Sequence, residues 1–205
     1  LRKSSGSVDS VVMESFDEEL VRRGARIFHR RLTFLERFGP MVQSVFEDLT
    51  GGAHHLGLRY DGLVSGVDDE DRLRDAFREQ LATSLAVDKR RRYTTRGPHV
   101  DDLVVTLDGH VARSHASQGQ HRVVALALKI SELRLAEASL DAPPVLLLDD
   151  VSSELDQTRN QQLMTHLDAG RGQVFITTTD RRWIHVSGET RVFSVSQGEV
   201  SFSPG

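Results

Sequence analysis

The stretch Pro144-Val145-Leu146-Leu147-Leu148-Asp149-Asp150 decides the fold. Four apolar residues after a proline predict a strand that is buried on both faces, as in a parallel sheet. Two carboxylates stand where this strand ends, and ligands of open parallel sheets bind beyond the carboxyl ends of the strands. One acid there can hold Mg²⁺ while its neighbour orients or deprotonates a water. The alternative is that these aspartates only form a turn or cap a helix.

Strands and helices alternate on both sides of this stretch. Because the loops between them are short, we expect parallel pairing with right-handed crossovers, and therefore an α/β fold with a mixed sheet and flanking helices. The terminal segment predicts a hairpin around Gln197-Gly198. The expected elements are a hairpin of 103–107 and 110–113 turning at Asp108-Gly109, helices 117–137 and 157–167, strands 145–148 and 174–177, and a hairpin of 192–195 with 200–202.

The helix expected at 117–137 opens with Ser117-Gln118-Gly119-Gln120. A serine hydroxyl, a glycine N–H and the positive end of a helix together can form an anion site. The alternative is an ordinary serine N-cap. Thr177-Thr178-Thr179-Asp180 ends the strand at 174–177, and its hydroxyls can contact a terminal phosphate or simply terminate the strand.

The N-terminal part of the chain has a helical pattern. Gly39-Pro40 is expected to break or kink this helix, and Gly51-Gly52 to end it. We expect three segments: a flexible entry segment (1–12), a mostly helical arm (13–93) and an α/β head (94–205). The predicted apolar face of the long helix consists of Phe16, Leu20, Ile27, Phe34, Phe38, Met41, Val45 and Leu49.

Composition sets the class of protein. The 205 residues are 38% hydrophobic and 27% charged, with a net charge of −4, which fits a globular protein with a core. Any nucleic-acid site must therefore be a local patch. Without cysteine, thiolate chemistry is excluded, and a reducing, cytoplasmic location is expected. No apolar run is long enough to cross a membrane, so we expect no membrane contact.

A basic run lies at Lys89-Arg90-Arg91-Arg92, with Arg96 close behind it. These side chains predict a phosphate-binding surface for DNA. A solvated charged face is an equally good interpretation. The phosphate-wrapping motif Gly-x-x-x-x-Gly-Lys-Ser/Thr, called Walker A, does not occur in the sequence, so we expect weak or no ATP binding by the chain alone.

Five motifs, taken in order, resemble the C-terminal part of the RecF family of bacterial DNA replication and repair proteins. One departure is Val100, where the family usually has arginine. The resemblance covers nearly the whole chain from about residue 13. The motifs are Arg96-Gly97-Pro98-His99, Ser117-Gln118-Gly119-Gln120, Val145 to Val151, Ser153-Glu154-Leu155-Asp156 and Ile176 to Asp180.

The resemblance implies the C-terminal half of an ABC-type ATPase head, with signature, Walker B and D-loop but without Walker A. It implies ATP and Mg²⁺ as cofactors, and an ATP-dependent homodimer that binds double-stranded or gapped DNA. Together with RecR and RecO, such a protein helps to load RecA in recombinational repair, replication and the SOS response.

The resemblance also implies roles for single residues. Asp149 would hold Mg²⁺, and Asp150 would stand at the position of a catalytic acid. Ser117-Gln118-Gly119-Gln120 would form the signature that contacts the γ-phosphate of ATP on the other subunit. Asp156 would belong to the D-loop at the dimer interface.

Two other functions stay open. Asp149 and Asp150, with Asp101 and Asp102, can serve a metal-dependent phosphoesterase. The chain can also be a module that binds DNA or protein without catalysis. Because the strands of the missing half would cover part of the head core, we expect an exposed apolar edge that favours non-native association.

Overall fold

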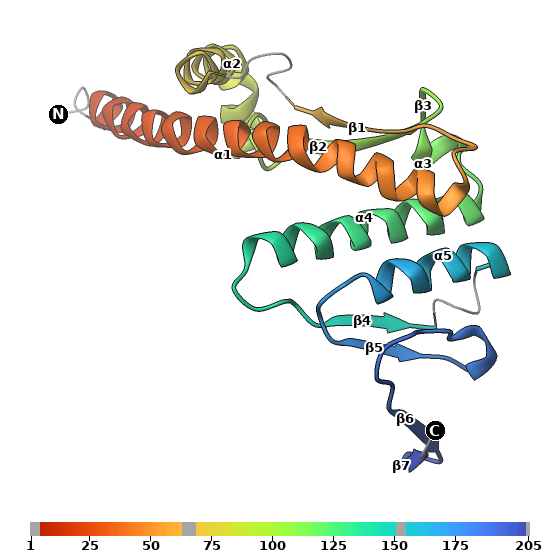
Figure 1. The fold of residues 1–205 in the computed structure, drawn as a ribbon. Helices are drawn as coiled ribbons and strands as arrows, with labels where there is room; N and C mark the ends of the chain where they lie inside the picture. Colours follow the sequence, from red (N-terminus) through yellow and green to blue (C-terminus); the bar gives the residue numbers. More distant parts are fainter. Residues whose placement is uncertain (1–4, 63–68, 151–154, 204–205) are drawn as a thin grey trace. The chain divides into compact units, whose positions relative to one another are not determined.

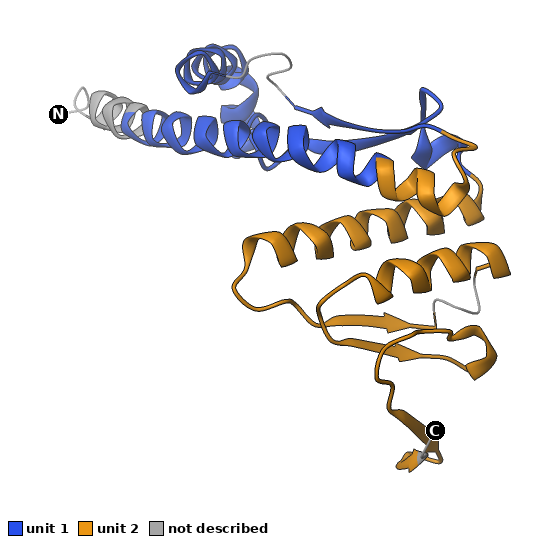
Figure 2. Ribbon diagram, viewed as in Figure 1, with its two compact units in different colours: residues 1–43, 55–116 blue, residues 44–54, 117–205 orange. Residues whose placement is uncertain are grey.

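The computed structural model of the protein describes residues 5–62, 69–150 and 155–203 (Figure 1). They form two compact units (Figure 2). Unit 1 is Leu1–Gln43 with His55–Ala116, and unit 2 is Ser44–His54 with Ser117–Gly205. The predicted division into 1–12, 13–93 and 94–205 stays a prediction. Among the described residues, no helix is long and apolar enough to cross a membrane.

Helix α1 (Ser5–Thr50) contributes to both units. It starts inside the predicted entry segment, of which residues 1–4 lie outside the described part. Of the expected break or kink at Gly39-Pro40, the break is wrong, because the helix continues through Pro40, and the kink stays a prediction. A proline inside a helix costs about 3 kcal/mol, and buried Phe38, Val42, Val45 and Phe46 on either side offset that cost.

The end of α1 is where the sequence predicts it. Gly51 and Gly52 have φ angles of 65° and 75°, in the left-handed region that glycine adopts without strain. The amide of Gly52 donates to the carbonyl of Glu47 at 2.9 Å, which satisfies one of the last carbonyls of the helix.

The predicted apolar face of α1 is wrong at three positions of its first half, although Leu20 packs against the core as predicted. Phe16, Ile27 and Phe34 are exposed, whereas Val21, Ala25 and Phe28 are buried. Both stripes have spacings of three and four residues, so periodicity alone does not separate them. The buried stripe is the one that packs in unit 1 with Leu73, Phe77 and Leu81 of helix α2 (Glu70–Arg91).

Aromatic packing holds α1 and α2 together. The rings of Phe28 and Phe77 meet edge to face, with centroids 5.1 Å apart. Gly24 allows this approach, because a Cβ at that position would lie 2.4 Å from Cε1 of Phe77. Helix α2 begins at an N-cap, where Asp69 accepts from the amides of Asp71 and Arg72.

Unit 1 also contains an antiparallel sheet in the order β1-β2-β3. The predicted turn at Asp108-Gly109 is confirmed, with φ angles of 51° and 82° that suit a two-residue hairpin. The pairing of β1 with β2 runs from Leu56↔Leu107 to Asp61↔Asp102. The elements are β1 (Leu56–Asp61), β2 (Asp102–Leu107), β3 (His110–Val111) and the short helix α3 (Ala112–His115).

Unit 2 contains the predicted alternation of helices and strands. Strands β4 and β5 pair in parallel, which confirms the expected crossover through α5. The terminal strands β6 and β7 form the expected hairpin around Gln197-Gly198. The elements are α4 (Gln118–Ser139), β4 (Leu146–Asp149), α5 (Gln157–Asp168), β5 (Val174–Thr177), the 3-10 helix η2 (Arg181–Trp183), β6 (Val192–Ser196) and β7 (Glu199–Ser203).

Strand β4 is buried on one face only, so the prediction of burial on both faces is wrong here. Leu148 is 8% exposed, but Leu147 is 73% exposed. Helices α4 and α5 lie on one side of the β4–β5 pair in Figure 1. The apolar side chains of Val145, Leu147 and Phe175 are exposed. This agrees with exposed apolar surface on a half head.

A histidine packs into unit 2 beside an arginine. Nη2 of Arg134 donates to Nδ1 of His166 at 2.7 Å, and Nε2 of His166 lies 3.7 Å from Asp48. Burial, together with the charge of Arg134, lowers the pKa of His166 below 6.5, although Asp48 opposes the shift. The imidazole therefore binds a proton less readily in the folded protein than in the unfolded chain.

We expect Gly24→Ala to destabilise the protein by about 1–3 kcal/mol, because the added methyl overpacks against Phe77. Gly39→Ala is the matched control on the same helix, where a Cβ meets nothing within 4 Å. It should leave the free energy of unfolding unchanged or raise it by up to about 1 kcal/mol. Urea unfolding measures both, and equal effects would contradict the packing at Gly24.

We expect His166 to make the free energy of unfolding decrease as the pH falls below 6.5. The reason is that His166 binds a proton more readily in the unfolded chain than in the native state. His166→Gln should remove that part of the slope. His185→Gln, at an exposed position, should keep it. The measurement is the free energy of unfolding between about pH 7.5 and 5. If His166→Gln leaves the slope of stability against pH unchanged, the lowered pKa of His166 is contradicted.

Candidate nucleotide site

The carboxyl end of β4 is tied to the end of β5. In the parallel register Asp149 lies opposite Thr177. The hydroxyl of Thr177 donates to Oδ1 of Asp149. The amide of Asp150 donates to the carbonyl and to the hydroxyl of Thr177, at 3.1 and 3.0 Å. Two strand ends thus hold one exposed carboxylate in place.

Asp150 has an unusual backbone. Its φ angle is +46°, in the left-handed region that few residues other than glycine adopt. Aspartate tolerates this conformation better than most side chains do, but it still costs stability, and such costs concentrate at functional sites. Asp149 is the last residue of β4, and the backbone leaves the strand at Asp150.

The acids fit a bound Mg²⁺ ion in the way proteins usually hold one. Mg²⁺ is commonly bound through one or two carboxylates together with waters and substrate phosphates. Asp149 offers an exposed carboxylate whose Oδ1 is fixed by Thr177. Within the described ranges, no cluster of three or more potential metal ligands forms a complete cage.

The predicted anion site begins α4. Ser117 and Gln120 form a reciprocal capping box, in which Ser117 Oγ accepts from the Gln120 amide at 3.2 Å and Gln120 Oε1 accepts from the Ser117 amide at 2.8 Å. The N-cap interpretation of Ser117 is therefore correct as local structure. Helix geometry still leaves the amides of Gln118 and Gly119 without an intrahelical acceptor, as an anion site needs.

The first turn of α5 lies close to the first turn of α4. Asp156 caps α5 by accepting from the Arg159 amide at 2.9 Å, and its Oδ2 lies 3.4 Å from Nη1 of Arg159. That guanidinium nitrogen is 3.9 Å from the position of a Cβ on Gly119. Asp156 thus holds a cation beside the glycine of the predicted signature. Val151 to Glu154 lie outside the described residues.

The structure groups these predicted residues in two sets within unit 2. One is Asp149 and Asp150 with Thr177, and the other is Ser117 to Gln120 with Asp156 and Arg159. In Figure 1, the end of β4 and the first turns of α4 and α5 lie toward the same end of unit 2. A parallel strand with a crossover helix produces this arrangement.

Two residues of this region do not follow from the sequence motifs. Arg159 has only a weak local signal, its position three residues after a capping aspartate. His54 comes from a distant segment, and its Nε2 lies 3.4 Å from Nε2 of Gln120. Only the tertiary structure shows these contacts.

The predicted DNA-contacting arginines belong to unit 1. Arg90, Arg91 and Arg92 are exposed at the end of α2, and Arg96 is exposed in the loop that follows. Asp88 secures this turn by accepting from Ser84 and Thr95. Burial raises the pKa of Asp88, but these hydrogen bonds outweigh it and leave the pKa below 3.8.

The remaining acids and His99 have local partners. Asp101 accepts from the hydroxyl of Tyr60, and Asp102 accepts from the amide of Leu103 at 2.8 Å. Nε2 of His99 lies 2.9 Å from the carbonyl of Thr94. All of these contacts lie within unit 1, so they do not join Asp101 and Asp102 to the acids at the end of β4.

No protein-family model matches the chain, but individual proteins do. RecF of Anaeromyxobacter sp. (strain Fw109-5), a DNA replication and repair protein, is 43% identical over 206 residues, covering 98% of this chain and 55% of the relative. RecF of Geobacter sulfurreducens is 42% identical over 193 residues, covering 92% and 53%. The chain spans about half the length of the curated relatives it matches.

A solved structure gives the same result. The recombination mediator protein RecF-ATP in the RecFOR pathway superposes with a TM-score of 0.78 at 31% identity, over 94% of this chain and 50% of that one. The α/β architecture, with its helices and small sheets, is therefore that of RecF. Over nearly its whole length, this chain is homologous to about half of each RecF protein that it matches.

Proposed function

We propose that this chain is one half of an ATP-dependent DNA-binding protein of recombinational repair and replication. The observation that carries the proposal is the end of β4, where Asp149 is fixed by Thr177 on the parallel neighbour. The similarity to a solved RecF-ATP structure supports a nucleotide as the ligand.

The proposed roles follow from the chemistry of each group. Asp149 holds Mg²⁺, which supplies charge neutralisation at the phosphates when it is bound. Asp150 orients or deprotonates the attacking water. The amides of Gln118 and Gly119, with the Ser117 hydroxyl, bind the γ-phosphate of ATP on the other subunit of a homodimer. Gln120 supports this turn through the capping box.

Asp156 acts partly through Arg159 in this proposal. By accepting from the Arg159 amide and lying beside its guanidinium, it holds a positive charge next to Gly119. A guanidinium matches a phosphate in both charge and geometry. Arg159 is therefore a positioning and charge-supplying residue of the same nucleotide site.

The DNA-contacting surface is proposed at Arg90, Arg91, Arg92 and Arg96, which are exposed together at the end of α2 and in the loop after it. Four cations neutralise DNA phosphates and make binding sensitive to salt. Double-stranded or gapped DNA, RecR and RecO as partners, RecA loading and a cytoplasmic location are further parts of this proposal.

We expect no ATP turnover by this chain alone and turnover when it is mixed with a Walker A half from a RecF relative. Asp149→Ala should abolish that turnover, and Asp150→Asn should lower kcat by about 10²–10⁴-fold. Asp141→Ala, which removes an exposed loop carboxylate of unit 2, is the control and should keep full turnover.

The same mixture separates the competing functions. A stable complex without turnover would contradict the ATPase proposal and favour a binding module. In that case DNA binding should fall on charge reversal at Arg90 to Arg92, with no effect of Asp149→Ala. Phosphoester hydrolysis by the chain alone with Mg²⁺ or Mn²⁺ would favour the phosphoesterase.

We expect Asp150→Gly to raise the free energy of unfolding by about 1 kcal/mol, because glycine adopts the +46° φ angle without strain. The same variant should lose turnover in the mixture, because it lacks the carboxylate. Urea unfolding and phosphate release measure the two effects. A destabilised Asp150→Gly would show that the side chain serves structure rather than function.

A further inference from the structure

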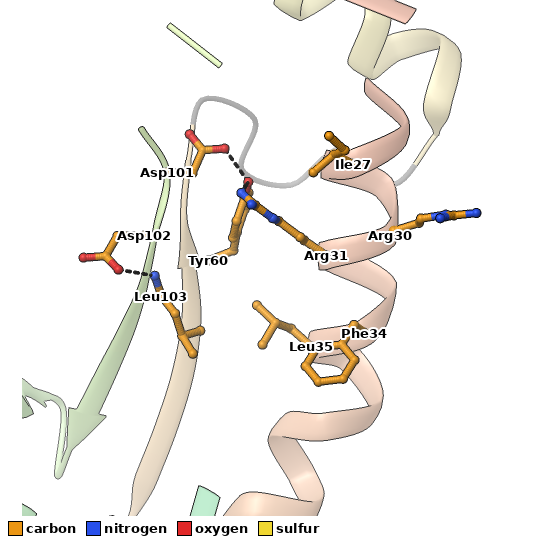
Figure 3. A pocket seen from close by; sticks show the side chains of 9 residues that line it. All are labelled: Ile27, Arg30, Arg31, Phe34, Leu35, Tyr60, Asp101, Asp102 and Leu103. Carbon is orange, nitrogen blue, oxygen red and sulfur yellow. Dashed lines mark hydrogen bonds between the residues drawn. The ribbon is translucent and has the colours of Figure 1, made fainter. Parts of the chain in front are cut away.

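Unit 1 has a pocket of about 410 Å³ between α1 and the first strands. Its walls come from α1, from the end of β1 and from the start of β2 (Figure 3). All of them belong to unit 1, so the pocket is independent of the nucleotide site proposed in unit 2. The lining residues are Ile27, Arg30, Arg31, Phe34, Leu35, Tyr60, Asp101, Asp102 and Leu103.

Most of the pocket wall is apolar. Ile27, Phe34 and Leu103 are 41%, 45% and 38% exposed, and Leu35 lies beside them. Ile27 and Phe34 are side chains that periodicity predicts for the core, yet both stay partly exposed, although the ring of Phe34 stacks on that of Phe38. Exposed apolar side chains that gather around one concave site mark a place where a ligand or partner binds.

One end of the pocket is polar and ordered. Nη1 of Arg31 donates to the carbonyl of Pro98 at 2.6 Å and to the Tyr60 hydroxyl at 3.3 Å, and Tyr60 donates to Asp101. Figure 3 shows the three side chains meeting at this end. Burial and the hydrogen bond to Asp101 raise the pKa of Tyr60 to about 12, so the phenol stays a donor.

This end presents a donor and an acceptor of opposite charge side by side. A guanidinium has five N–H donors and a carboxylate has two oxygens, so Arg31 and Asp101 keep hydrogen-bonding capacity beyond their mutual link through Tyr60. A polyanion is disfavoured, because Asp101 and Asp102 offset the nearby arginines. The complementary group is neutral and both donates and accepts, as a peptide group does.

We propose that the pocket binds a segment of a partner protein through one large apolar side chain with its flanking peptide groups. The side chain fills the space between Ile27, Phe34 and Leu103. The neighbouring peptide group accepts from Arg31 and donates to Asp101. An anchor of this kind, in a pocket with a few fixed polar groups, is the usual centre of a protein interface.

The test uses N-acetyl-phenylalaninamide as the probe and N-acetyl-glycinamide as the probe without an anchor. Chemical shifts of the ¹⁵N-labelled chain should move at the lining residues with the first probe only. Phe34→Ala, which enlarges the pocket, and Arg31→Met, which removes the donors, should each weaken binding by about tenfold. Arg37 lies on the same helix but outside the pocket, so Arg37→Met should bind the first probe as tightly as the wild type does.

Far-UV circular dichroism and a thermal melt confirm that each variant is folded. Binding that is indifferent to Phe34→Ala and to Arg31→Met would overturn the proposal. Chemical shifts that move at the lining residues with a hexathymidine oligonucleotide, but not with N-acetyl-phenylalaninamide, would also overturn the proposal. If the probe binds the chain alone but not its complex with the Walker A half, the occupant belongs to the same protein, and the partner proposal fails.

Discussion

The parallel pairing of β4 with β5 is the constraint on which the candidate site depends. Parallel strands need a crossover, and this one leaves β4 at its carboxyl end, so the first turn of α5 lies toward that end before the helix returns the chain to the start of β5. The same pairing puts Thr177 beside Asp149, so a hydroxyl from one strand fixes the carboxylate of the other. A slip of one residue in this register would remove that contact.

Local signals in the sequence were enough to predict much of this architecture. The helix stop at Gly51-Gly52, the turn at Asp108-Gly109 and the cap at Ser117 each depend on the conformational preference of the residues themselves. The apolar run ending in Asp149 likewise predicted the parallel strand and the acids at its end. These features need no knowledge of distant residues.

What the sequence did not predict depends on tertiary packing. Two stripes on α1 have helical spacing, and only the packing of Phe77 against Phe28 determines which one is buried. Pro40 stays inside the helix because buried neighbours outweigh its cost. Leu147 lies uncovered because the described residues supply a layer for one face of β4 only. The proximity of Arg159 to Gly119 likewise required the folded chain.

The proposed nucleotide site joins two kinds of observation. The strand end supplies a fixed carboxylate, and the first turns of α4 and α5 supply amides and a guanidinium. Each group alone has a structural explanation as a turn, a cap or an ion pair. Their order along the chain and the similarity to RecF give the combination its functional meaning.

Paramagnetic broadening by Mn²⁺·ATP tests whether the carboxyl end of β4 binds the metal–nucleotide complex. The protein is the ¹⁵N-labelled chain assembled with a Walker A half, and the readout is the intensity of each amide signal. We expect the strongest broadening at Asp149, Asp150 and Thr177, with little at Asp101 and Asp102. Broadening centred on Asp101 and Asp102, or absent from the end of β4, would contradict this expectation.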